Sequence, residues 1–579
     1  MKYVNLLFCA LLVYLFYLMV SLHIPYQLHQ LEHSSLFIGG TDFFLQSFFQ
    51  LGGLGKWIAL FGIQFMAFWG IASCVFILPV LLLFGITVYL LPIKRVYAFP
   101  VAAWVAVSLM LSMFDYDYDW SGAISLSFSL CVLLIISFIK HHVAKITIYL
   151  VSLPCIAWFF GPVVWVYLIC GICLLINGSN WKWLLVFSIG IVSLMFVGIY
   201  FLGMIGTFQE VVSPVFYYNV LNDFPLYHWM SWGVLALAFI GSRIVRIDFV
   251  RHKALLWSVY ACAWLIPCGL FVHYVPILTN SSMQVLYRLN HYSYMESWDS
   301  MLKLLSGSRL DNWLYMNYVN MALAQKGELG NKAFLFKPQG QAALMVNLSP
   351  DGVVRMLKSD VNYTVGCIAE AQHQAFDAQI AHRKRMGIQT LKRLVQTNLI
   401  LGHYGVAQKY LELIEKTTFY KEWAREYQSF LYNDEAVLAH AELGEKRRSL
   451  IQDNRFVLVN GWTPELESIV QMNPLNRRAM DYLGIAYLLG KEMDAFSLLL
   501  EKYYGTGALP QLPEAFQQAV LTLYNENESM CDKYAIPQEM RNEYHRFLEW
   551  NERNINKPDR KRIMESEFGH TFWYYSKFV

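Results

Sequence analysis

The stretch from Trp183 to Met204, WLLVFSIGIVSLMFVGIYFLGM, decides the fold of this chain. It carries no charged side chain, and a helix of roughly 20 apolar residues spans the hydrocarbon core of a bilayer, which is about 30 Å thick. Runs of the same kind occur on both sides of it, at 3–22, 66–91, 96–114, 121–139, 146–160, 162–177, 229–242 and 254–276. The sequence therefore predicts an all-α chain whose first part is a polytopic helical bundle of about nine membrane spans.

The composition changes sharply along the chain. Hydrophobic residues make up 56% of it and charged residues 15%, with a mean hydropathy of +0.37, whereas a typical globular domain is about 25% charged. Only 11 Lys+Arg and 8 Asp+Glu occur up to Pro276, and 34 of each follow. We therefore expect a transmembrane domain at 1–277 and a soluble domain at 278–579. Neither has the basic excess that nucleic-acid binding requires.

Two of the apolar stretches allow more than one interpretation. Residues 57–91 are too long for one simple span at about 1.5 Å per residue. They form either one span with an interfacial lead-in, broken near Gly70, or two short spans. Residues 146–177 form either one long helix or a tight hairpin, because the Gly161–Pro162 pair favours a turn.

The distribution of Lys and Arg chooses between these alternatives, because cytoplasmic loops are enriched in both. With one span in 57–91 and two in 146–177, ten of the eleven basic residues fall on the cytoplasmic side and only Lys56 falls outside. This arrangement places the N-terminus inside, makes 23–56 the first external loop and puts 278–579 outside the cytoplasm. The ten are Lys2, Lys94, Arg95, Lys140, Lys145, Lys182, Arg243, Arg246, Arg251 and Lys253.

The first external loop contains a candidate catalytic carboxylate. Phe43, Phe44, Phe48 and Phe49 recur at helical spacing after Asp42, which is typical of a short helix lying in the membrane interface. Thr41 or Asp42 is then expected to cap the helix. The cap is the simpler role for Asp42, and catalysis is the functional alternative.

The second external loop, FDYDYDW at 114–120, places Asp115, Asp117 and Asp119 among aromatic residues. Carboxylates accept protons from attacking hydroxyls or hold a divalent metal ion, and aromatic faces stack on sugar rings. A solvated turn is the simpler interpretation of the three acids. Seven of the eight acids before Pro276 are predicted to be external: Glu32, Asp42, Asp115, Asp117, Asp119, Glu210 and Asp223, with Asp248 as the exception.

The soluble part shows amphipathic helix pairs at the spacing of helical-hairpin repeats. One pair runs through 391–404 and 405–415, another through 479–490 and 495–504, and the segment at 335–361 is expected to interrupt them. The second pair resembles the tetratricopeptide pattern, with Leu483, Gly484, Tyr487 and Ala495 at its packing positions. Such pairs stack into an α-solenoid, and solenoids of this kind usually bind peptides or proteins. No nucleophile elbow, phosphate loop or zinc spacing is present, so no cofactor is evident.

The whole chain resembles a family of uncharacterised bacterial membrane proteins known only as a domain of unknown function. The resemblance is carried by GGTDFFLQSFFQLGGL at 39–54, LKRL at 391–394, TTFYKEW at 417–423 and GHTFWYY at 569–575. It implies the architecture and a bacterial source but no activity.

The topology is also similar to that of membrane glycosyltransferases of the C superfamily. These have an internal N-terminus, a long first external loop with interfacial helices and a catalytic Asp, many further spans and often an external C-terminal domain. The resemblance implies a catalytic role for Asp42, with Asp115, Asp117 and Asp119 as second-loop acids, a lipid-linked sugar donor and a divalent metal ion. The external loops of this chain offer only Lys56 for the donor phosphate.

Three functions follow from these observations. The first is an envelope scaffold or assembly factor in the bacterial inner (cytoplasmic) membrane, with membrane lipids around its spans and a partner protein on its external helical repeats. The second is a glycosyltransferase that uses a lipid-linked sugar. The third is a transporter, which is disfavoured because such proteins usually carry charged residues in mid-span.

Overall fold

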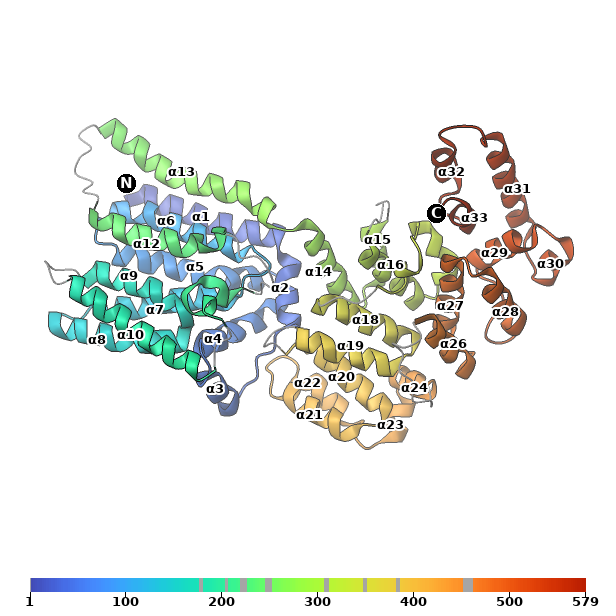
Figure 1. Cartoon of the computed structure of the whole chain (residues 1–579), viewed down its shortest axis with the longest axis horizontal. Coiled ribbons are helices and arrows are strands. Elements are labelled where there is room, and N and C mark those ends of the chain that lie inside the picture. Colours follow the sequence, from blue (N-terminus) through green and yellow to red (C-terminus); the bar gives the residue numbers. More distant parts are fainter. Residues whose placement is uncertain are drawn as a thin grey trace. The chain divides into compact units, whose positions relative to one another are not determined.

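The computed structural model describes residues 2–175, 181–203, 207–218, 226–244, 253–306, 312–346, 351–381, 386–450 and 462–579. Every named element in these ranges is a helix, which confirms the all-α prediction (Figure 1). The chain forms two compact units. Unit 1 comprises Met1–Val285 together with Lys416–Phe419, and unit 2 comprises Leu286–Glu415 with Tyr420–Val579.

Unit 1 contains the long apolar helices and a few short elements at their ends. The helices are α1 (Lys2–His23), α2 (Pro25–His33), α3 (Thr41–Phe48), α4 (Gly53–Ile63), α5 (Ile71–Leu90), α6 (Arg95–Met113), α7 (Trp120–Ser137), α8 (His142–Phe160), α9 (Val164–Leu175), α10 (Trp181–Phe201), α11 (Gln209–Val212), α12 (Met230–Ile244) and α13 (Lys253–Leu278). The 3₁₀ turns are η1 (Gln64–Ala67), η2 (Gly161–Val163), η4 (Pro214–Tyr217) and η5 (Leu226–Trp229).

Several of these helices are apolar enough to span a membrane. Within the described residues, seven helical stretches are long and apolar enough to do so: Tyr3–His23, Ile71–Leu90, Arg95–Met113, Trp120–Ser137, His142–Leu175, Lys182–Phe201 and Trp257–Leu278. Two shorter apolar stretches, Gly53–Ala67 and Met230–Ile244, accompany them. This is the pattern expected of a membrane protein, because a helix that is hydrophobic on all sides must be buried in protein or lipid.

The 34-residue stretch His142–Leu175 is a hairpin rather than one long helix. The hydroxyl of Tyr149 in α8 donates to the carbonyl of Leu168 in α9 at 3.0 Å, and Ser152 pairs with Tyr167. These contacts require the chain to reverse between α8 and α9. It does so at η2, where Gly161 has a φ of +80°, a value that glycine adopts without steric cost.

The stretch 57–91 is broken at Gly70, as one of the two interpretations has it. Gly70 has a φ of +79° and precedes α5 directly. Before it, α4 runs antiparallel to α7, because Gly55 packs on Ser125 and a Cβ placed on Gly62 would lie 2.6 Å from the ring of Trp120. The lead-in to α5 is therefore a separate short helix with its own direction.

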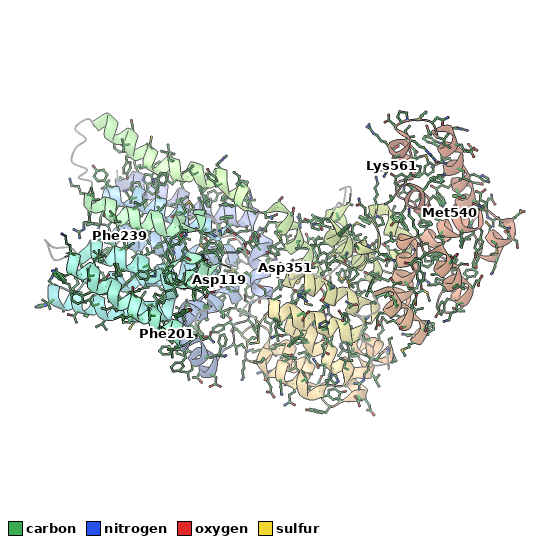
Figure 2. All side chains as sticks on the ribbon, viewed as in Figure 1. Asp119, Phe201, Phe239, Asp351, Met540 and Lys561 are labelled. Carbon is green, nitrogen blue, oxygen red and sulfur yellow. The ribbon has the colours of Figure 1, made fainter. Side chains whose placement is uncertain are left out.

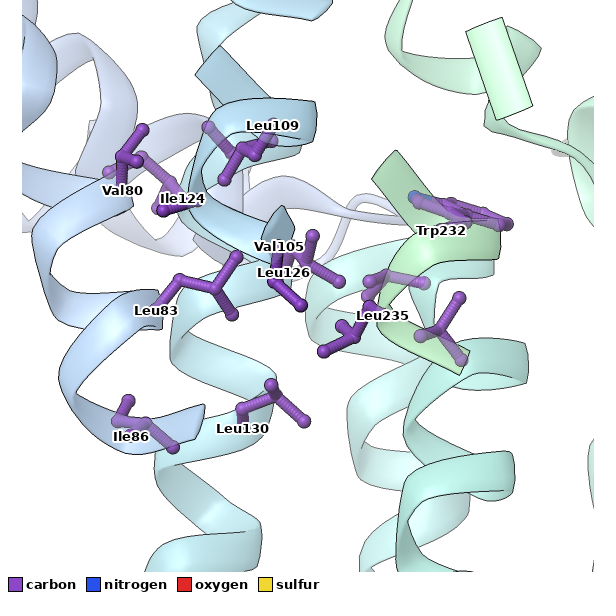
Figure 3. Close-up of a cluster of buried hydrophobic side chains, with 14 of the residues drawn as sticks. Val80, Leu83, Ile86, Val105, Leu109, Ile124, Leu126, Leu130, Trp232 and Leu235 are labelled. Carbon is purple, nitrogen blue, oxygen red and sulfur yellow. The ribbon is translucent and has the colours of Figure 1, made fainter. Parts of the chain in front are cut away.

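The core of unit 1 extends over most of its helices, and Figure 3 shows the part between α5, α6, α7 and α12. The indole N–H of Trp120 donates to the carbonyl of Phe76 at 3.2 Å, and the hydroxyl of Ser127 donates to that of Pro79 at 2.7 Å. These bonds tie α7 to the backbone of α5 and show that the two helices run parallel. The packed side chains are Val80, Leu83, Ile86, Val105, Leu109, Ile124, Leu126, Leu130, Trp232 and Leu235.

The first and last long helices of unit 1 also run parallel. Phe8 of α1 stacks on Trp264 of α13 with ring centroids 5.2 Å apart, and Phe16 of α1 meets Phe271 of α13 at 5.1 Å. The amide of Asn5 donates to the carbonyl of Val96 at 3.2 Å. The beginnings of α1 and α6 therefore lie at one end of the unit, and α13 ends at the opposite end from the N-terminus.

Unit 2 continues from α14, the helix in which the boundary between the units falls, through short helices of ordinary polarity. They are α14 (Ser281–Tyr294), α15 (Trp298–Leu305), α16 (Trp313–Gln325), α17 (Leu329–Lys332), η7 (Ala333–Phe336), η8 (Gln341–Ala343), α18 (Gly352–Val365), α19 (Ile368–Ala381), α20 (Ile388–Leu401), α21 (Tyr404–Glu415), α22 (Lys421–Gln428), α23 (Asp434–Ala439), α24 (Ala441–Arg448), α26 (Trp462–Met472), α27 (Arg477–Gly490), α28 (Met493–Tyr503), α29 (Glu514–Tyr524), α30 (Glu528–Lys533), α31 (Gln538–Arg553), α32 (Arg560–Phe568) and α33 (Phe572–Phe578).

Many consecutive helices of unit 2 pack against each other, most extensively from α18 through α22. Non-consecutive helices also meet, since α17 packs on both α27 and α29. The expected interruption at 335–361 is wrong in its second half, because α18 begins at Gly352. The carboxylate of Asp351, a residue labelled in Figure 2, caps this helix: it accepts hydrogen bonds from the backbone N–H groups of Val353 and Val354. Asp351 follows residues 335–346, which form only short 3₁₀ turns, so the capping signal was easily overlooked.

Candidate functional site

Asp42 lies in the first turn of α3 and is exposed to solvent. The expectation that Thr41 or Asp42 caps this helix is wrong. The cap position is held by Gly40, whose φ of +130° and ψ of 159° suit glycine, and it makes no side-chain cap hydrogen bond. Asp42 is therefore one position inside the helix, where a carboxylate interacts favourably with the positive end of the helix dipole.

The aromatic residues around Asp42 divide α3 into two faces. Phe44 packs against Trp57 with centroids 5.3 Å apart, and Phe48 packs against Phe159 at 4.9 Å. Leu45 and Phe49 on the other face are 48% and 64% exposed. The short amphipathic helix is thus present as predicted, and its position in the membrane interface stays a prediction.

The three acids of the second external loop have different environments. Asp115 is only 7% exposed, so the interpretation of this loop as a solvated turn is wrong for this residue. One carboxylate oxygen of Asp115 accepts from the backbone N–H of Asp117 at 3.0 Å. Asp119 is the cap of α7 (Figure 2), accepting from the backbone N–H of Ser121 at 2.9 Å. The loop is therefore fixed by two of its own carboxylates.

His228 is a partner of Asp115 that the sequence reasoning missed. Its Nε2 lies 2.9 Å from the second carboxylate oxygen of Asp115, and the histidine is 3% exposed. Its ring stacks on Tyr218 at 3.9 Å, and Tyr218 meets Tyr118 at 5.0 Å. The sequence signal for it was weak, since His228 merely ends the aromatic stretch 205–228 between two apolar runs.

These contacts make a buried carboxylate–imidazole pair enclosed by tyrosines. Burial raises the pKa of Tyr118 well above its ordinary value, and the neighbouring Tyr218, Tyr217 and Asp119 raise it further. The Tyr118 hydroxyl therefore stays protonated in this cluster. A carboxylate–histidine pair can relay a proton, but Asp42 takes no part in the hydrogen bonds that join Asp115, Asp117 and His228.

The other predicted external charges are placed as follows. Glu32 is 2% exposed within α2, and its carboxylate lies 3.7 Å from Nδ1 of His33. Glu210 is in the first turn of α11. The ammonium of Lys56 lies 5.1 Å from the centroid of the Phe216 ring. Asp223, also predicted to be external, lies outside the described residues, as do Arg246, Asp248 and Arg251, which were predicted to be cytoplasmic.

No metal centre was found in the part of the chain that the structure describes. There, no group of three His, Cys, Asp or Glu side chains can hold a metal ion. The α2 sequence HQLEH at 29–33 has the H-x-x-E-H spacing of some zinc enzymes. The ring of His29 packs on Trp69, with centroids 4.0 Å apart. The divalent ion implied by the glycosyltransferase resemblance therefore has no ligand set among the described residues.

Unit 2 contains a cavity of about 580 Å³. Its walls come from α14, α15, α16, α18, α20, α22 and α24, and sequence reasoning did not predict it. Ligand sites in proteins usually measure about 300–1,000 Å³. The lining residues are Ser293, Tyr294, Met295, Glu296, Trp298, Met321, Gln325, Met356, Asp360, Tyr363, Thr364, Gln389, Lys392, Arg393, Gln396, Trp423, Tyr427 and Glu442.

An ion pair lies in the wall of this cavity. The guanidinium of Arg393 donates to the carboxylate of Asp360 at 3.0 Å, and the hydroxyl of Ser293 donates to the other oxygen at 3.3 Å. The guanidinium also lies 3.7 Å from the centroid of the Tyr363 ring. Burial raises the pKa of Asp360 although Arg393 and Ser293 act to lower it.

A second cation in the wall is held by aromatic rings. The ammonium of Lys392 lies 5.2, 4.9 and 5.1 Å from the ring centroids of Tyr294, Tyr420 and Trp423, and it donates to the Tyr294 hydroxyl at 3.0 Å. Such contacts stabilise a cation by about 0.5–2 kcal/mol each. Lys392, Arg393 and Trp423 belong to the segments 391–394 and 417–423 that carried the family resemblance.

Comparison with known proteins adds one finding. No curated protein and no solved structure matches the chain. A family described as "Family of unknown function (DUF6057)" matches residues 1–579, which is the whole chain. The chain therefore belongs to this family of unknown function.

Proposed function

We propose that the chain is an envelope scaffold or assembly factor of the bacterial inner membrane. In this proposal nine helices span the bilayer: α1, α5, α6, α7, α8, α9, α10, α12 and α13. Unit 2 then lies outside the cytoplasm as a solenoid of tetratricopeptide-like pairs and docks a partner protein. Membrane lipids surround the exposed faces of the spans.

The parallel course of α1 and α13 supports the external position of unit 2. Phe8 lies on Trp264 and Phe16 on Phe271, so both helices point the same way. If both cross the bilayer, the chain after Leu278 emerges on the side opposite to the N-terminus. The basic residues favour a cytoplasmic N-terminus, which leaves the external side for unit 2.

The docking role rests on one observation. Unit 2 is a series of packed short helices, and some of its large apolar side chains are exposed to solvent. By contrast, two of the four candidate catalytic acids, Asp115 and Asp119, already accept hydrogen bonds from backbone N–H groups, which argues against a catalytic role for them. Ile380 on α19 is 63% exposed and Leu498 on α28 is 66% exposed. Burying an exposed aliphatic side chain against a partner protein contributes about 1.5–3 kcal/mol.

Site-specific photo-crosslinking in living cells tests this role. A photoreactive residue at Ile380 or at Leu498 is expected to capture one defined protein. The matched control is Leu194 on α10, which is 75% exposed on an apolar helix and is expected to capture lipid. A pattern at Ile380 and Leu498 that does not differ from that at Leu194 would contradict the proposal.

Asp42 supports a second candidate, a glycosyltransferase that uses a lipid-linked sugar. It is the exposed carboxylate among the four candidates, and it stands on a helix whose aromatic residues suit the membrane interface. An exposed carboxylate in that place can accept the proton of an acceptor hydroxyl. A glycosyltransferase of this kind would lose its activity without the Asp42 carboxylate, whereas a scaffold would not depend on it.

Asp42→Asn is expected to leave protein level unchanged, because loss of a charge near a helix N-terminus costs about 0.3–1 kcal/mol. Asp494→Asn is the matched control, since Asp494 is also exposed at the second position of its helix, α28. The surface-glycan profile of cells is the readout. An unchanged profile in the Asp42 variant removes the glycosyltransferase from consideration.

A further inference from the structure

The cavity of unit 2 has an unusual lining for a site that would hold an apolar side chain. Leu, Ile and Val are absent from its eighteen lining residues, and three Met are the aliphatic contribution. Five aromatic residues, Tyr294, Trp298, Tyr363, Trp423 and Tyr427, provide the apolar surface. A pocket for a hydrophobic anchor carries only a small number of polar groups, whereas ten of the eighteen lining residues are Ser, Thr, Gln or charged, so the lining favours a different ligand.

The polar groups of the lining include donors and acceptors in similar number. Gln325, Gln389 and Gln396 each offer both, Lys392 and Arg393 donate, and Glu296, Asp360 and Glu442 accept. The formal charges of these side chains nearly cancel, with two cations against three carboxylates. A strongly anionic or strongly cationic ligand is therefore not favoured over a neutral one.

Several of these groups are held in place before any ligand arrives. Asp360 is fixed by Arg393 and Ser293, and Lys392 by its three aromatic neighbours. The amide of Gln389 exchanges hydrogen bonds of 3.1 and 3.3 Å with the buried Asn290. Fixed polar groups bind a ligand with less loss of side-chain entropy than mobile ones.

We propose that this cavity binds an uncharged saccharide. Planar carboxylate, amide and guanidinium groups match pairs of neighbouring hydroxyls, which both donate and accept, and aromatic surface suits the apolar C–H face of a pyranose ring. The volume of about 580 Å³ accommodates a small oligosaccharide end. The inference goes beyond the docking of a partner protein and does not depend on it.

The test uses the full chain in lipid nanodiscs, without glycoside detergents, because their sugar headgroups would compete. The probes are neutral oligosaccharides of hexose, N-acetylhexosamine, deoxyhexose and pentose, and binding is measured by saturation-transfer NMR and calorimetry. At least one probe is expected to bind saturably. Its affinity is expected to fall roughly tenfold or more in both Gln396→Ala and Lys392→Met, which change the lining without removing the buried Asp360–Arg393 pair.

Gln408→Ala is the matched control, because Gln408 lies on the next helix, α21, outside the cavity, and it is expected to bind like the unaltered chain. The proposal is overturned if none of the probes binds, or if the two lining variants bind as tightly as the control. It is also overturned if a random peptide mixture occupies the cavity and the oligosaccharides fail to compete. Loss of the cross-links at Ile380 and Leu498 would not affect it.

Discussion

Lys446 is the most thoroughly buried cation next to the cavity of unit 2. It lies on α24 and is 4% exposed. Its ammonium donates to the carbonyl of Thr364 at 2.8 Å and lies 3.8 Å from the carboxylate of Glu445. Burial lowers the pKa of Lys446 to about 8, against the opposing effect of Glu445 and Glu442. The charged form is therefore tolerated at neutral pH at a cost to stability.

This cost predicts a pH dependence of folding. Between about pH 8 and about pH 10.5 the unfolded chain keeps the Lys446 proton and the folded chain releases it, so the stability of unit 2 rises with pH. A pKa lowered from 10.5 to about 8 corresponds to about 3 kcal/mol. Thermal unfolding measured across this pH range is the test. The increase in stability with pH is expected to disappear in Lys446→Met and to remain in Lys502→Met, because Lys502 is exposed on α28. Parallel curves for the two variants would disprove it.

The sequence predicts such residue environments only in part. The clustering of Asp115, Asp117 and Asp119 drew attention to residues 114–120, and their role as catalytic candidates stays a prediction. The clustering did not show that Asp115 meets His228, because the two are 113 positions apart and only the packing of the loops joins them. The same holds for Ser293, Asp360 and Arg393, which come from three helices.

At the scale of elements, close helix packing in unit 2 depends on a few glycines. Gly484 of α27 faces the ring of Phe516 in α29, and a Cβ placed on it would overlap that ring. Gly484 was expected at a packing position within a tetratricopeptide-like pair. In the structure it packs against α29, which is not its partner in that pair. The identity of the pair as a tetratricopeptide repeat stays a prediction.

Gly484→Ala is expected to destabilise unit 2 by about 1–3 kcal/mol, the usual cost of overpacking a filled core. Gly405→Ala is the control, because Gly405 is also helical and its added Cβ would meet nothing nearer than the Tyr432 hydroxyl at 3.8 Å. That variant should be unaffected or slightly stabilised. Limited proteolysis of the full chain against temperature measures both. Equal midpoints would show that α27 and α29 adjust freely.

Most of the elements themselves followed from periodicity and apolar length. The expected run 254–276 is α13 (Lys253–Leu278), and the expected pair at 391–415 is α20 and α21. Such elements are predictable because each is specified by its own residues. The separate direction of α4 was not predicted, since it depends on the packing of Gly55 and Gly62 against α7.

At the scale of the whole molecule, the main question is which side of the membrane each end occupies. Lys94 lies between α5 and α6, Arg95 is the first residue of α6, and Lys140 lies between α7 and α8. Because α5 and α7 run parallel, both basic junctions lie at the same end of unit 1. A common end for these basic residues is what their predicted cytoplasmic position requires, and that position stays a prediction.

Compartment-sensitive reporters fused at residues 118 and 290 test the nine-span topology. Both are expected to report the external side, while a third at residue 142 is expected to report the cytoplasm. The reason is the enrichment of Lys and Arg in cytoplasmic loops. A cytoplasmic signal at residue 290 would mean that the number of spans is even, and the external role proposed for unit 2 would then fail.

The α8–α9 hairpin has a consequence for how the protein is made. Between Lys145 and Lys182 the sequence contains no charged residue, and the turn Gly161–Val163 is buried. Neither half of the hairpin presents a charge that the translocon would have to carry across the bilayer. If both helices insert into the bilayer, they can do so as a pair joined through Tyr149 and Leu168. This pair then offers the faces against which α10 and α12 pack.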